Sequence, residues 1–178
     1  YLGVFLDALA EEVDQLYLFM HESSRKGMHF CDYKIKSKNI ILISLKRKQP
    51  AWLRFIIPSL SIYGIRERIK ECDVLLVRAP SPLAPAFYYK FHKITRVCFL
   101  IVGDYLDGIK YLHQPLLRKW AIQLLTIRND HQLRNVFGRT LVLVNSEELY
   151  CKYKKISYMI KVVRTTTISN KDFYFRSD

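Results

Sequence analysis

The chain has 178 residues, 50% of them hydrophobic and 25% charged, so it is long enough for a domain with a buried core and too apolar for intrinsic disorder. Its 29 lysines and arginines against 16 acidic residues give a net charge of +13, which predicts an anionic partner: nucleic acid, phospholipid headgroups or a phosphorylated substrate. No apolar run reaches the ~18 residues that a membrane-spanning helix needs, and four cysteines without a Cys-x-x-Cys pair favour reduced thiols in the cytoplasm.

The first part of the chain begins with a helical pattern and continues with short apolar runs of strand length. Leu2, Leu6, Leu9 and Val13 recur at helical spacing. In chain order we predict a helix at 2–13, a strand at 15–20, and an irregular stretch at 21–37 with a short strand at 33–35. A strand at 39–44 and a basic aromatic loop at 46–58 follow. The last element of this part is a helix from Ser59 or Ser61 to Lys70.

The second part alternates buried-type strands with helices. We predict a strand at 73–77, a proline-containing loop at 78–82, an aromatic helix at 84–92 and a strand at 96–102. A long helical region through 112–127 follows, with Pro115 in the first turn of its main segment. The chain continues with a strand at 140–144, a helix capped by Asn145 or Ser146, and a last strand at 159–163.

Strands that are apolar on both faces and alternate with helices indicate an α/β fold. We therefore predict, over residues 1–178, a single Rossmann-like domain with a doubly wound, mostly parallel sheet and helices on both faces. This architecture normally begins with a strand, whereas the chain begins with a helix. We expect a first strand and its glycine-rich turn upstream, with Gly3 as the last part of that turn.

Ligands of such sheets bind outside the carboxyl ends of the strands, so polar residues at those ends are the candidate site. Asp104 could accept a hydrogen bond or a proton from a sugar hydroxyl, or simply stabilise a turn. Ser146 and Glu147 open a helix whose amino terminus favours an anion, although capping alone would also explain them. Arg78 could hold a phosphate or remain solvated. The remaining candidates are His21, Ser81, Tyr105 and Arg164.

A second candidate region is the basic aromatic segment formed by Lys46, Arg47, Lys48, Trp52, Arg54 and Phe55. It could dock on an anionic membrane, stack on nucleic acid bases, or tuck its apolar residues into the domain. The sequence has no metal-ligand spacing of His and Cys, and no Gly-x-Ser-x-Gly, P-loop or Gly-x-Gly-x-x-Gly motif. It therefore predicts no metal or cofactor and argues against a serine hydrolase or a P-loop enzyme.

Four segments together resemble the amino-terminal domain of GT-B fold glycosyltransferases, and most of all the retaining family 4 enzymes. They are Cys72-Asp-Val-Leu-Leu-Val-Arg-Ala-Pro-Ser-Pro82, Gly103-Asp104, Leu141-Val-Leu-Val-Asn-Ser-Glu147 and Val162-Val-Arg-Thr-Thr-Thr-Ile-Ser-Asn-Lys-Asp-Phe173. The sequence departs from the family at Gly103, where a histidine is common, and at Thr166-Thr-Ile-Ser-Asn170, where the family usually has Asn-Gly-Val-Asp.

The resemblance implies two Rossmann-like domains facing a cleft. This chain would bind a saccharide or lipid-linked acceptor, and a carboxy-terminal domain absent from it would bind the nucleotide-sugar donor. The resemblance further implies sugar transfer without a metal, no turnover by this half alone, and a cytoplasmic enzyme that is peripheral on the inner membrane face. Two alternatives stay open: a basic nucleic-acid-binding α/β module, which we favour less, and a fragment of a Rossmann dinucleotide enzyme whose glycine motif lies upstream.

Overall fold

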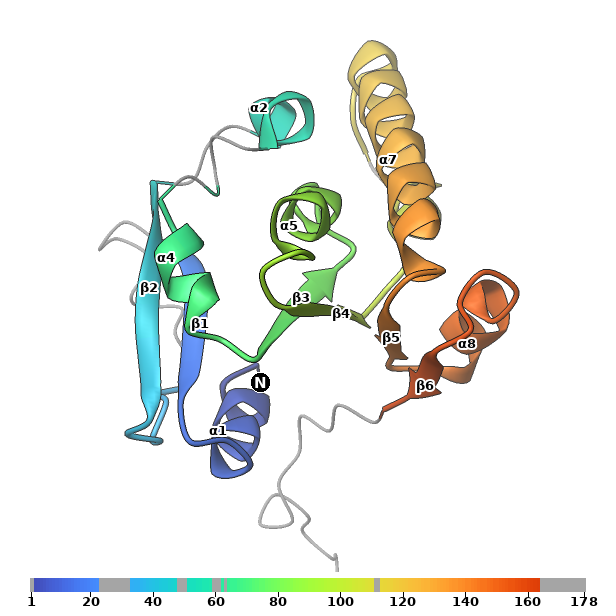
Figure 1. Ribbon diagram of the computed structural model, residues 1–178. Coiled ribbons are helices and arrows are strands. Elements are labelled where there is room, and N and C mark those ends of the chain that lie inside the picture. The colour runs from blue at the N-terminus through green and yellow to red at the C-terminus, as the bar shows by residue number, and fades with distance from the viewer. Residues whose placement is uncertain are drawn as a thin grey trace, which may run out of the picture. The chain divides into compact units, whose positions relative to one another are not determined.

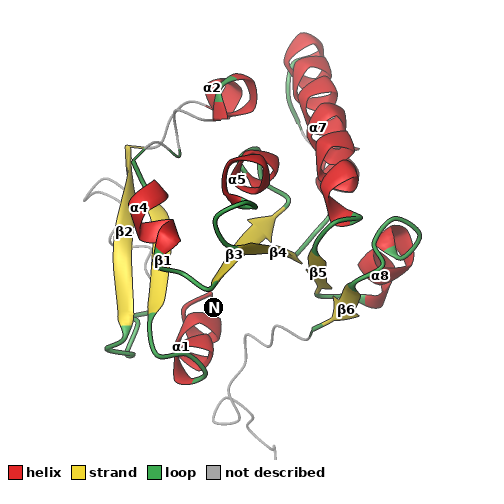
Figure 2. Ribbon diagram, viewed as in Figure 1, coloured by secondary structure: helices red, strands yellow, loops and turns green. Residues whose placement is uncertain are grey.

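A computed structural model describes residues 2–22, 33–47, 51–58, 62, 64–110 and 113–163 (Figures 1 and 2). Its helices are α1 (Leu2–Glu11), α2 (Ala51–Ile56), α4 (Arg66–Lys70), α5 (Ala84–Phe91), α6 (Tyr105–Lys110), α7 (Leu116–Phe137) and α8 (Glu147–Tyr153). Its strands are β1 (Leu16–Glu22), β2 (Ile40–Arg47), β3 (Val74–Ala79), β4 (Arg96–Ile101), β5 (Leu141–Val144) and β6 (Ile160–Val162). The chain divides into two compact units, which meet in sequence at Lys48 and Gln49.

The first unit contains α1, β1 and β2. The two strands pair in parallel with Leu16 opposite Ile40 and Phe19 opposite Ile43. Asn39, just before β2, holds the segment that joins α1 to β1. Its side-chain amide donates to the carbonyl oxygens of Ala10 (2.7 Å) and Val13 (2.9 Å). The Ala10 carbonyl belongs to the last turn of α1, where carbonyl groups lack a hydrogen-bond donor within the helix, so the Asn39 side chain provides one.

A buried aspartate ties α1 to the segment before β2. The Asp7 carboxylate accepts hydrogen bonds from the Tyr33 hydroxyl (2.7 Å) and from the backbone amides of Lys36 (3.1 Å) and Ser37 (2.9 Å). The hydrogen bond from Tyr33 and those from the Ser37 and Lys36 amides hold the pKa of Asp7 well below its ordinary value, although burial opposes them. Gly3 lies beneath the same tyrosine, and a Cβ at that position would overlap the ring.

The second unit contains a four-stranded parallel sheet in the order β3-β4-β5-β6. Because strand order follows chain order, every crossover steps in the same direction along the sheet. Right-handed crossovers then place the intervening helices on one face. Figure 1 shows α5, α7 and α8 on the same side of these strands.

Buried aromatic rings fill the space between that face and the helices. Phe99 of β4 lies 5.5 Å, between ring centroids, from Phe137 of α7, which lies 5.2 Å from Tyr153 of α8. Tyr88 of α5 packs against Phe99 from the other side at 6.4 Å. Burial of such rings is the main contribution to the stability of this unit.

The α/β class and the parallel pairing are confirmed, and every predicted strand except the one at 33–35 is found, within three residues at each end. The described strands form two separate sheets, and α5, α7 and α8 lie on one face of the sheet of the second unit. A single doubly wound sheet with helices on both faces therefore remains a prediction.

Three local predictions are corrected. Residues 33–35 are not a strand, because Asp7 takes the amides that follow them instead of a neighbouring strand. Residues 46–58 are not a loop, because β2 continues to Arg47 and α2 occupies Ala51–Ile56. Helix α4, which ends at Lys70 as predicted, begins at Arg66 after Gly64, whose φ of 85° favours glycine. Its N-cap is Ile65, and the predicted caps Ser59 and Ser61 lie outside the described residues.

Candidate functional site

The carboxyl ends of β3, β4 and β5 meet at one edge of the sheet. The Val102 amide donates to the Ala79 carbonyl (2.9 Å), and the Asn145 amide donates to that of Ile101 (3.2 Å). The Asn145 side chain adds a bond to the Val102 carbonyl (3.3 Å). The segments that follow these strands therefore share a rim, as the sequence predicted for the stretches that carry Ser81, Asp104 and Ser146.

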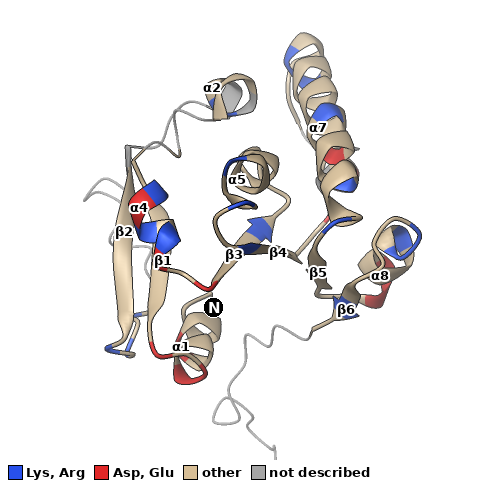
Figure 3. Cartoon of the chain, in the orientation of Figure 1, with Lys and Arg blue, Asp and Glu red and all other residues tan. Residues whose placement is uncertain are grey.

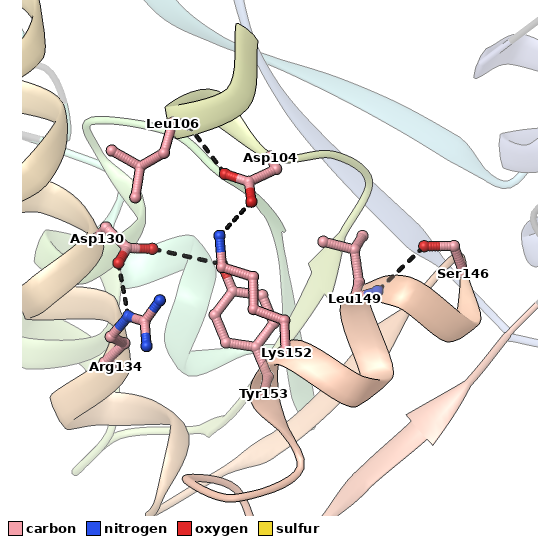
Figure 4. Close-up of polar contacts among 8 residues, drawn as sticks. All are labelled: Asp104, Leu106, Asp130, Arg134, Ser146, Leu149, Lys152 and Tyr153. Carbon is pink, nitrogen blue, oxygen red and sulfur yellow. Dashed lines mark hydrogen bonds and ion pairs between the residues drawn. The ribbon is translucent and has the colours of Figure 1, made fainter. Parts of the chain in front are cut away.

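Asp104 is the central charged group of this rim. One carboxylate oxygen accepts from the Leu106 amide (2.9 Å), and the other forms an ion pair with the ammonium of Lys152 from α8 (Figure 4). The side chains of Asp104 and Lys152 are only 16% and 25% exposed, so water screens the pair weakly.

The environment of Asp104 keeps its carboxylate ionised. Burial acts to raise its pKa, but the hydrogen bonds from Lys152 and the Leu106 amide, with the charge of Lys152, hold the pKa below the ordinary value. Such a carboxylate is a weak base and a good hydrogen-bond acceptor.

A second charged pair lies beside the first (Figure 4). Asp130 accepts from Arg134 Nε at 2.6 Å, one turn along α7, and from the hydroxyl of Tyr153 at 3.4 Å. The Tyr153 ring lies within 5.4 Å of Lys152 Nζ and 5.6 Å of the Arg134 guanidinium carbon, measured to the ring centroid. Burial and the charges of Asp130 and Asp104 raise the pKa of Tyr153, so this phenol stays neutral.

Two cavities flank this cluster, and Asn129 lines both. The cavity against Asp104 has a volume of about 10 Å³, room for roughly one water molecule. The other, of about 420 Å³, is lined mainly by apolar residues, among them Tyr89 of α5, whereas α7 contributes mostly polar ones, including exposed Arg128. A ligand of more than a few atoms fits only the larger one.

Several predicted site residues use their side chains for local structure. The Ser146 hydroxyl caps α8 by accepting from the Leu149 amide (3.3 Å), and Glu147 is an exposed residue of that first turn. The Ser81 hydroxyl accepts from the Leu83 amide (3.3 Å) before α5. For Ser146, the structure supports the capping interpretation.

Arg78 does not join the rim cluster. It lies within β3, and its side chain is exposed on the face of the sheet opposite the one that buries Val77 and Ala79. Tyr105 begins α6, but its side chain lies outside the described structure, as does all of Arg164.

His21 belongs to the first unit, near the carboxyl end of β1. Both of its ring nitrogens are buried, and neither has a hydrogen-bond partner among the described residues. A buried polar group without a partner is rare in folded proteins, so His21 remains a candidate for ligand recognition.

The predicted membrane segment is divided between the two units. Lys46 and Arg47 end β2, whereas Trp52, Arg54 and Phe55 belong to α2. Nε of Arg54 is buried without a hydrogen-bond partner in the described structure. The side chains of the other four, and all of Lys48, lie outside the described residues, so docking by this segment stays a prediction.

Sequence reasoning missed four members of the rim cluster: Lys152, Asp130, Arg134 and Tyr153. The spacing of Asp130 and Arg134 on a helix was a usable signal, since residues four apart face each other. Nothing local predicts the Asp104–Lys152 pair, whose members are 48 residues apart.

Neither the buried thiol of Cys98 nor metal binding adds a candidate site. Cys98 is buried and its pKa is raised to about 11 by desolvation, which makes it unreactive. Over the described ranges, His, Cys, Asp and Glu form no cluster that could bind a metal ion, and none of the helices has the length and apolarity needed to cross a membrane.

The rim cluster and the larger cavity both lie in the second unit, and α7 contributes residues to each. In comparisons with known proteins, the chain matches no family model, no curated protein and no solved structure.

Proposed function

We propose that the chain is the acceptor-binding half of a glycosyltransferase, which transfers a sugar from a nucleotide-sugar donor to a saccharide or lipid-linked acceptor. The observation that carries the proposal is the ionised carboxylate of Asp104 at the carboxyl rim of a parallel sheet. Open α/β sheets bind their ligands at this rim. The proposal includes a Rossmann-like domain with helices on both faces of one sheet.

In this proposal Asp104 positions the acceptor hydroxyl. Since the Lys152 ion pair keeps the carboxylate charged, Asp104 accepts a hydrogen bond from the acceptor hydroxyl. This hydrogen bond orients the hydroxyl oxygen toward the donor sugar. The small cavity on the inner side of Asp104 has no room for a sugar. The hydroxyl therefore approaches from the exposed side of the carboxylate.

The body of the acceptor would occupy the larger cavity. Its volume of about 420 Å³ lies within the range of small-molecule sites. The exposed ring of Tyr89 offers a flat apolar surface, and Asn129 lines both this cavity and the one at Asp104. A carboxy-terminal domain would bind the nucleotide-sugar donor and stabilise the charge that develops on its leaving phosphate.

The test is sugar transfer by the complete coding sequence, using labelled nucleotide sugars with oligosaccharide and lipid-extract acceptors. We expect transfer by the full-length protein and none by residues 1–178 alone. The Asp104→Asn variant should lose about 100-fold or more of the transfer rate, because a positioned charged acceptor becomes a neutral amide.

The matched control is Asp73→Asn, which makes the same change of charge at an exposed position before the amino end of β3. It should transfer at the unmodified rate. Equal rates for both variants would remove Asp104 from the mechanism. Failure of every donor, together with tight and salt-sensitive binding to random oligonucleotides, would favour the nucleic-acid-binding alternative.

A further inference from the structure

Helix α7 carries apolar residues on two different faces. In its second half, Leu133, Val136 and Phe137 are buried. In its first half the buried position is the polar Thr126, whereas large apolar side chains are exposed. These five are between 48% and 89% exposed: Leu116, Leu117, Trp120, Leu124 and Ile127. We call them the outer stripe.

The outer stripe is one continuous surface. Leu117, Trp120, Leu124 and Ile127 are spaced by three, four and three residues, which places them on one side of a helix. Leu116 lies beside them. Figure 1 shows the amino-terminal part of α7 extending beyond α5, and the 12 residues from 116 to 127 span about 18 Å.

The charged residues next to the stripe in the sequence are of one sign. Between Asp107 and Asp130 the sequence has no acidic residue, but it has Lys110, Arg118, Lys119 and Arg128. Arg118 and Arg128 are exposed, and Figure 3 shows the basic positions along α7. An exposed apolar stripe that contains a tryptophan and whose charged neighbours along the helix are all cations is typical of helices that lie in a membrane interface.

We infer that the outer stripe of α7 docks the protein on an anionic lipid bilayer, with the helix lying in the interface. The stripe enters the boundary between headgroups and acyl chains, while Arg118 and Arg128 extend to the phosphates. A second copy of the chain is a poorer partner, because pairing two stripes would bring cations together without an acidic residue to match them. The inference is independent of the proposed glycosyl transfer.

The binding test uses co-sedimentation of residues 1–178 with vesicles of phosphatidylcholine alone or mixed with phosphatidylglycerol. We expect at least about tenfold stronger binding to the anionic vesicles, since each cation near the surface contributes roughly a fivefold change. The variant Leu117→Gln/Trp120→Gln/Leu124→Gln should lose at least about tenfold on the same vesicles. Because all three side chains are exposed, the fold should survive, as circular dichroism will check.

The control, Tyr158→Gln/Met159→Gln, removes two exposed apolar side chains between α8 and β6 and should bind like the unmodified protein. Equal loss in both variants, or no preference for anionic vesicles, would overturn the inference. So would a concentration-dependent dimer that the stripe variant abolishes while vesicle binding persists.

The two tryptophans locate the surface directly. Trp52→Phe leaves only Trp120, and Trp120→Phe leaves only Trp52 in α2. We expect brominated anionic lipid to quench the fluorescence of the first variant. Quenching of Trp52 without quenching of Trp120 would overturn the assignment to α7 and assign the contact to the basic aromatic segment instead.

Discussion

Asp7 and Asp104 are both largely inaccessible aspartates with lowered pKa values, one in each compact unit, but their partners differ in kind. Asp7 accepts from a neutral hydroxyl and from two backbone amides. Asp104 accepts a hydrogen bond from one backbone amide, and its other partner is the long, charged side chain of Lys152.

This difference separates a structural carboxylate from a candidate functional one. The donors of Asp7 are parts of the backbone and a packed ring, so no ligand can replace them without unfolding the segment. Lys152 reaches Asp104 through a flexible side chain, so a ligand hydroxyl can share the carboxylate oxygen while the ion pair keeps it charged. A perturbed pKa alone therefore does not identify a site, and the identity of the partner decides.

The largest loss of stability should come from Asp7→Asn. The Lys36 and Ser37 amides and the Tyr33 hydroxyl all donate to the Asp7 carboxylate. In asparagine, one of the two carboxylate oxygens is replaced by an NH2 group, which is itself a donor and cannot accept these hydrogen bonds. We expect the urea midpoint to fall furthest for this variant. Asp14→Asn, at an exposed position after α1, is the control and should unfold like the original chain. Equal midpoints for both variants would show that the Asp7 network contributes nothing.

Lys152→Gln should have a smaller effect, which depends on pH. With Lys152 removed, burial should dominate and raise the pKa of Asp104, and about 1–2 kcal/mol of stability should be lost at pH 7. A carboxylate whose folded pKa is lowered stabilises the fold above its unfolded value of 3.8, and that stability is lost as the pH falls through the folded pKa.

The difference between Lys152→Gln and the unmodified chain should therefore shrink below about pH 4. Carbon-13 titration of the Asp104 carboxyl and urea unfolding at several pH values measure both effects. The control is Lys154→Gln, because Lys154 is exposed at the end of the same helix. A pKa of Asp104 that does not rise in Lys152→Gln would contradict the ion pair as the cause.

Sequence patterns predicted the elements of the fold well where burial alone determines them. The run from Val97 to Ile101 forms a strand buried on both faces, as its unbroken apolar character indicates. The helix in 46–58 was missed because its mixture of basic and aromatic residues suggested a loop, and its prolines are compatible with a helix. Pro50 in fact precedes the first residue of α2 and Pro58 follows its end, the two places where a helix tolerates proline.

Contacts between distant residues could not be predicted in the same way. The outer stripe of α7 has the spacing of a core-facing helix, and only the fold shows that Leu117 and Trp120 are exposed. Likewise, the sequence predicted that Asp104 would lie at the rim, but not that it would form an ion pair with Lys152. Periodicity reports that a face is apolar, whereas the tertiary structure decides what covers it.

The smallest expected effects come from two glycines that differ only in what surrounds them. Alanine generally stabilises a helix by about 0.5–1 kcal/mol relative to glycine. Gly108 in α6 has open space where the methyl group of an alanine would lie, so Gly108→Ala should raise stability by that amount. At Gly3 the added methyl would overlap the Tyr33 ring, which its hydrogen bond to Asp7 holds in place.

Gly3→Ala should therefore lower the free energy of unfolding by about 1 kcal/mol, because crowding outweighs the gain in helix propensity. Urea unfolding of both variants measures the contrast. Combining Gly3→Ala with Tyr33→Leu, which frees the ring position from the Asp7 carboxylate, should recover the helix gain relative to Tyr33→Leu alone. If Gly3→Ala is as stabilising as Gly108→Ala, the Tyr33 ring can move aside at little cost in free energy, and its hydrogen bond to Asp7 does not hold it in place.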